Sequence, residues 1–124
     1  MANGIDLVRS WHFIREGRPS RDVMAVLLDG ERVLACYQTV RDQAVFTDLR
    51  LIVRDAQGIT GKKVEVFSVP WESVQMWSSE NAGQVIDIDS EIELWTLVGH
   101  LKINLARGVD VRAVERIIAS RVFG

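Results

Sequence analysis

The sequence has little cysteine and proline and no long apolar run. Cys36 is the single cysteine among 124 residues, so no internal disulfide can form. It lies in the apolar run 33–37, where we expect a buried and unreactive thiol. No stretch approaches the ~18 consecutive apolar residues of a membrane-spanning helix, and the first residues do not resemble a signal peptide. These absences predict a cytoplasmic protein.

An excess of positive charge is also missing. The chain has 15 basic and 17 acidic side chains and a formal net charge of -2. Domains that bind nucleic acid usually carry a basic footprint, so we do not expect nucleic acid as a partner. The length and the 48% of hydrophobic residues are typical of one globular domain with a single core.

The sequence shows no recognisable catalytic constellation. In 58-GITGKK-63, Gly58 and Gly61 enclose two residues and Lys62 is followed by another lysine. A phosphate-binding P-loop needs four residues between its glycines and a Ser or Thr after the lysine. The two histidines lie in different elements and have no visible metal or triad partner. We therefore predict no catalytic residues, no metal site, no cofactor and no enzymatic activity.

An alternating acidic series, Asp87, Asp89, Glu91 and Glu93, would place four like charges on one face of a strand. Basic strand neighbours, a second subunit or a cation could offset them. The series lacks the glycine and the final glutamate of a calcium-binding loop, so we favour a solvated or salt-bridged face.

The N-terminal part has a helical period. Leu7, Trp11 and Ile14 recur at i, i+4 and i+7, before Gly17 and Pro19 interrupt the pattern. A second short helix follows, capped by Ser20, with four apolar side chains on one face: Val23, Met24, Leu27 and Leu28. We expect a helical extension over residues 1–29 and a separate domain over residues 30–124.

From residue 30 onward the hydrophobic period changes to two, which predicts antiparallel strands joined by turns. The expected strands are 33–40, 44–47, 49–54, 63–69, 74–79, 91–98 and 101–106. A last helix begins after the N-cap Asp110, with a stripe formed by Val111, Val114, Ile118 and Val122. Seven strands closed by one helix predict an α+β fold.

The run 42-DQAVFTDLRLIVRDAQGITGKKVEVFSVPWESV-74 and the run 80-ENAGQVIDIDSEIELW-95 resemble the bacterial pleckstrin-homology (PH) domain family. The resemblance covers roughly residues 27–123, and it departs from the family pattern at Asp48-Leu49, Val66-Phe67 and Trp71. It implies a seven-stranded, strongly bent antiparallel β-sandwich or barrel capped by the C-terminal helix. It also implies a homo-oligomer of cyclic symmetry with no catalytic residues.

Several strands carry apolar residues on both faces, although a half-solvated antiparallel sheet should alternate. The N-terminal helices, the terminal helix or a second copy of the chain could cover the extra face. The resemblance favours a second copy. Our candidate interface residues are Ile52, Phe67, Trp77, Trp95 and Leu97.

Basic residues near the first hairpin and the following strands suggest an alternative, a surface that binds anionic lipid. The candidates are Arg41, Arg50, Arg54, Lys62 and Lys63. The multi-basic pattern of phosphoinositide-binding PH domains is absent, and solvated turn lysines explain most of these charges. The expected partners are therefore a second copy first, and an anionic lipid or a protein ligand second.

Overall fold

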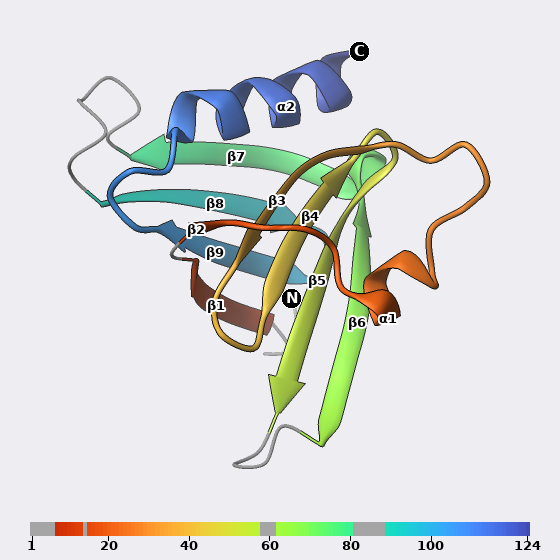
Figure 1. Cartoon of the computed structure of the whole chain (residues 1–124). Coiled ribbons are helices and arrows are strands. Elements are labelled where there is room, and N and C mark those ends of the chain that lie inside the picture. Colours follow the sequence, from red (N-terminus) through yellow and green to blue (C-terminus); the bar gives the residue numbers. More distant parts are fainter. Residues whose placement is uncertain (1–6, 14, 58–61, 81–88) are drawn as a thin grey trace.

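The computed structural model describes residues 7–13, 15–57, 62–80 and 89–124. They form two β-sheets whose strands cross steeply, with a helix at one open end (Figure 1). The first sheet, sheet A, has the order β1-β9-β8-β7, and the second, sheet B, has the order β2-β3-β4-β5-β6. Neither α-helix among these residues is long and apolar enough to cross a membrane.

All seven predicted strands form, and the period-two pattern predicted their bounds closely. The strands are β3 (Val33–Gln38), β4 (Gln43–Thr47), β5 (Arg50–Gln57), β6 (Lys63–Pro70), β7 (Val74–Glu80), β8 (Ser90–Thr96) and β9 (Gly99–Leu105). Each sequential pair within a sheet is antiparallel. β5 continues to Gln57, three residues beyond the expected end of this strand at residue 54. A short 3₁₀ helix, η1 (Trp71–Ser73), joins the two sheets.

The predicted helical N-terminus is wrong. Residues Leu7–Phe13 form β1, which pairs in parallel with β9, and Arg15–Glu16 form the short β2 beside β3. The described residues thus contain nine strands in an open two-sheet sandwich, where we expected seven in a sandwich or barrel. Trp11 and Phe13, two residues apart, both point into the core, as period two requires. Of the second predicted helix, only α1 (Arg21–Met24) forms, and the Ser20 side chain makes no cap hydrogen bond.

The C-terminal helix α2 (Val111–Phe123) is confirmed with its cap. The Asp110 carboxylate accepts hydrogen bonds from the backbone N–H groups of Arg112 and Ala113, which the first helical turn leaves without partners. Val111, Val114 and Ile118 are buried in the main core, and α2 packs on β7, β8 and η1. Residues from both sheets and α2 contribute to this core: Phe46, Leu51, Val53, Ile92, Leu94, Ile103, Val114 and Ile118.

Candidate functional site

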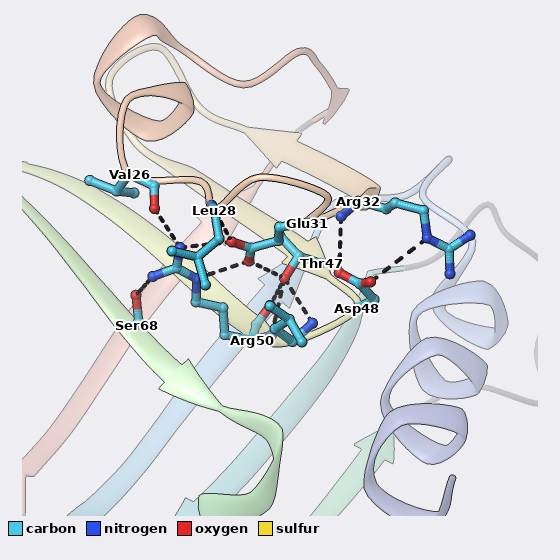
Figure 2. A network of polar contacts seen from close by, with 9 residues as sticks. Val26, Leu28, Glu31, Arg32, Thr47, Asp48, Arg50 and Ser68 are labelled. Atoms are coloured by element: carbon cyan, nitrogen blue, oxygen red, sulfur yellow. Dashed lines mark hydrogen bonds and ion pairs between the residues drawn. The ribbon is translucent and has the colours of Figure 1, made fainter.

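Arg50 is the centre of a polar network that fastens the segment before β3 to sheet B (Figure 2). Its Nε and Nη2 donate to the two carboxylate oxygens of Glu31 at 2.9 and 2.8 Å. Its other donors reach the Val26 carbonyl at 2.6 Å and the Ser68 hydroxyl at 2.9 Å. Thr47 donates to the same carboxylate at 2.6 Å. Arg50 is therefore occupied inside its own chain.

The environment of Glu31 keeps it ionised. The hydrogen bonds from Arg50 are the main cause that lowers the pKa of Glu31 from 4.5 to about 2, although burial opposes the shift. The Glu31 side chain is 0% exposed, so this ion pair is shielded from water. A buried carboxylate with two bonds from arginine and one from a hydroxyl has a structural role, which also accounts for its shifted pKa.

Arg54 lies four residues after Arg50 on β5 and makes a similar contact. Its Nε donates to both carboxylate oxygens of Asp22 at 3.0 and 2.8 Å. The pKa of Asp22 is lowered first by the hydrogen bond from the Ser20 hydroxyl and then by Arg54, against a cost of burial. Arg50 and Arg54 thus clamp the residues around α1 over the outer face of sheet B.

The segment that covers sheet B buries one of the predicted interface residues. Ile52 is fully buried in a small cluster with Val23, Cys36 and Val45, beneath α1. The sequence left open whether the N-terminal segment, the terminal helix or a second copy covers the extra apolar face. On sheet B the chain's own N-terminal segment covers it. Ile52 is not on the surface of the chain, and we remove it from the interface proposed below. Burial also raises the pKa of the Cys36 thiol to about 11, as expected for an unreactive cysteine.

The outer face of sheet A remains apolar at one end. Met76 on β7 lies opposite Trp95 on β8, and Leu97 follows in the turn between β8 and β9. Met76 is 53% exposed and Leu97 is 82% exposed, while Trp95 is half-buried and stacks on His100. We call these three residues the Met76–Trp95–Leu97 patch.

The Trp77 side chain points to the opposite face of sheet A from Met76, toward α2. Its Nε1 donates to the Glu115 carboxylate on α2 at 2.8 Å, and its ring lies 5.2 Å from that of Phe123 between centroids. A bulge between Val74 and Met76 shifts the register of β7, which reverses the alternation and turns Met76 outward in place of Trp77. Sequence alternation alone could not have shown Met76, because a bulge leaves no reliable mark in the sequence.

Phe67 and Leu97 line one pocket at the corner where the two sheets separate. It lies between β6 and the β8–β9 turn and has a volume of about 510 Å³. Arg9 on β1 closes one end: its guanidinium lies 4.6 Å from the Phe67 ring centroid and pairs with Asp55 and Glu65. The sequence predicts neither Arg9 nor this pocket, because the apolar residues around Arg9 match a helical period and not the strand that forms.

The acidic series has partners on the neighbouring strand. Glu93 lies opposite Lys102, and its carboxylate lies 2.9 Å from Nε2 of His100. The Asp89 carboxylate accepts a hydrogen bond of 3.0 Å from the backbone N–H of Arg107. Among the described members, neighbours in the chain thus offset part of the charge; Asp87 lies outside the described residues.

Three predicted basic residues gather at one end of sheet B. Arg41 donates to the Ala56 carbonyl at 3.2 Å, and Lys63 lies opposite Gln57 where β6 begins. Lys62 and Lys63 are exposed. The glycines of 58-GITGKK-63 lie outside the described residues.

Comparison with known proteins shows what this architecture is. The family described as "Bacterial PH domain" matches residues 5–122. The chain belongs to the bacterial PH domain family. A solved PH-domain protein of the DUF1696 family from Shewanella loihica PV-4 is similar, with 34% identity over 87% of this chain and 96% of that one and a TM-score of 0.75. The PH domain from Shewanella amazonensis SB2B shares 36% identity over 87% and 94% of the two chains, with a TM-score of 0.64.

The Bacillus subtilis protein YjqA, whose function is uncharacterized, is 53% identical over 70 residues, which are 56% of this chain. The match spans about half of YjqA, 55% of its length. The family match begins at residue 5, well before the region near residue 27 where we saw the resemblance, and so includes β1 and α1.

Proposed function

We propose that this bacterial PH domain is a non-catalytic binding and assembly module that self-associates into a cyclic homo-oligomer. The observation that carries the proposal is the Met76–Trp95–Leu97 patch, an apolar area on a sheet face over which no other described segment packs. Methionine and tryptophan are enriched at protein interfaces, and exposed apolar patches usually mark them. Half-buried Phe67 lies beside this patch at the corner pocket.

Two observations support a non-catalytic function. They are the family to which the chain belongs and the structural role of the carboxylates whose pKa is lowered. The carboxylates with the clearest shifts among the described residues, Glu31 and Asp22, are held by arginines in clamps that position a loop. The lone Cys36 remains a buried thiol, which suits the reducing cytoplasm that we propose as its location.

A ring of three or more copies needs a heterologous contact, in which the patch of one copy meets a different surface of the next. We expect light scattering after size exclusion at tens of micromolar to show one discrete oligomer for the natural chain. Met76→Glu should shift the mass to that of a monomer, because the new charge would be buried without a partner.

Val40→Glu is the matched control for this experiment. Val40 is 87% exposed in the turn between β3 and β4, so the same charge is added away from the patch and the oligomer should persist. A monomeric natural chain, or equal masses for the two variants, would contradict the proposal.

A second candidate function is contact with an anionic membrane surface. The observation in its favour is that the turn of Arg41 and the start of β6 with Lys62 and Lys63 lie at one end of sheet B. Against it, Arg50 and Arg54 are engaged with Glu31 and Asp22 inside the chain. Only three of the five predicted basic residues therefore support it.

A further inference from the structure

The side chains that line the corner pocket differ widely in their exposed fraction. Val69 and Leu101 are each 8% exposed, while Leu97 and Val98 are 82% and 68% exposed. The buried pair therefore forms the inner wall and the exposed pair forms the mouth. The pocket exists because sheet A and sheet B separate here, where β6 and β9 belong to different sheets and make no ladder with each other.

The size and the lining of the pocket suit a small apolar molecule. Its volume of about 510 Å³ falls within the range of about 300–1,000 Å³ that is usual for small-molecule sites. Phe67, Val69, Leu97, Val98 and Leu101 provide its apolar side chains. An occupant that covers them is favoured in proportion to the apolar area that it removes from water.

The charges in the lining argue against an anionic ligand. The basic side chains among the described lining residues already have carboxylate partners: Arg9 pairs with Asp55 and with Glu65 at 2.9 Å, and Nε2 of His100 lies 2.9 Å from the Glu93 carboxylate. A ligand carboxylate or phosphate would have to displace one of these acids. An uncharged ligand meets no such cost, so the charge pattern of the site is complementary to a neutral molecule.

One polar group at the edge of the pocket can orient the ligand. The Ser73 hydroxyl donates its hydrogen to the Pro70 carbonyl at 2.7 Å, so its oxygen retains lone pairs as acceptors. A ligand with one O–H or N–H group could donate to it.

We propose that the corner pocket binds an uncharged, mainly apolar small molecule that carries one hydrogen-bond donor. The pocket shares Leu97 with the Met76–Trp95–Leu97 patch, but Met76 and Trp95 lie outside its lining, so variants can test the two proposals independently. It is separate from the basic end of sheet B.

The test is a titration of the full chain with 1-octanol, followed by methyl NMR. We expect saturable shifts of the Val69, Leu97, Val98 and Leu101 methyl groups with one site per chain, and little change at Val23 in the small cluster under α1. Absence of saturable shifts at the lining residues of the natural chain would overturn the proposal. So would octanoate binding more than tenfold tighter than octanol, because it would identify an anion site.

A pair of double variants with the same charge change gives the control. Leu97→Glu with Val98→Glu removes the apolar mouth, and we expect binding of octanol to weaken at least tenfold. Met76→Glu with Val40→Glu changes two exposed apolar residues outside the lining, and binding should stay within about twofold. Thermal melts check that both variants fold.

The control also separates this proposal from self-association, because Met76→Glu is expected to dissociate the oligomer. If the Met76→Glu/Val40→Glu variant loses octanol binding together with its oligomeric state, a second copy completes the site and the pocket proposal is wrong. If the chain is a monomer and still binds octanol, the pocket proposal stands and the assembly proposal fails.

Discussion

At the scale of single residues, the ion pair between Glu31 and Arg50 decides how the N-terminal segment is held. Arg50 looks like a surface cation in the sequence, but its guanidinium contacts Glu31, Val26 and Ser68. Hydrogen bonds between charged groups are roughly twice as strong as neutral ones, and this pair is protected from water. Its energy therefore depends on the ionisation of Glu31.

The pH dependence of stability tests that role. The pKa of Glu31 is 4.5 as an ordinary glutamate and about 2 in the folded chain, so its contribution is complete above pH 4.5 and disappears as the pH falls through 2. Glu31→Gln should lower the free energy of unfolding at pH 7 by about 2 kcal/mol. Urea titrations from pH 7 to pH 2 should show the two curves converging in acid.

The control is Glu72→Gln, on an exposed glutamate of η1, which should follow the natural chain throughout. A gap between Glu31→Gln and the natural chain that stays constant down to pH 2 would show that the loss is steric and does not come from the charge.

At the scale of elements, β1 is where periodicity misleads. Leu7, Trp11 and Ile14 match a helix, yet Trp11 and Phe13 match a strand equally well over so short a segment. The free edge of β9 resolves the ambiguity, because a strand there satisfies its backbone groups and buries two aromatic rings. The side chain of Asn104 adds a hydrogen bond of 3.1 Å to the Trp11 carbonyl.

Two neighbouring alanine substitutions test the strand. Phe13→Ala should lower the free energy of unfolding by about 3–5 kcal/mol, since it empties a fully buried site. His12→Ala, on the exposed side of β1, should change it by less than about 0.5 kcal/mol. Chemical denaturation measures both, and a large loss for His12→Ala would contradict the inward and outward alternation of β1.

At the scale of the whole molecule, the two sheets have different covers. The segment around α1 covers sheet B, and its clamp occupies two of the five basic residues. The outer face of sheet A keeps its apolar end exposed. This asymmetry is the reason that we propose assembly on sheet A and place any membrane contact at the basic end of sheet B.

Flotation with anionic vesicles at low salt tests the membrane alternative. Lys62→Glu with Lys63→Glu should reduce the floating fraction strongly if that end contacts lipid, since each cation contributes about 1 kcal/mol near an anionic surface. Arg107→Glu with Arg116→Glu, two exposed residues on and before α2, gives the same charge change elsewhere. No flotation of the natural chain, or equal losses in both variants, would exclude this function.

The sequence by itself determined the seven strands from β3 to β9, the capped helix α2 and the membership of the family. The strands and the helix depend on local period, turn chemistry and capping, which neighbouring residues encode, whereas the family follows from the resemblance of two long runs to its known members. Only the tertiary structure decided that β1 is a strand, that Ile52 is covered, that Arg50 and Arg54 are occupied, and that a bulge turns Met76 outward. Each of these depends on a contact between distant segments or on a shift in register, and no local pattern records such events.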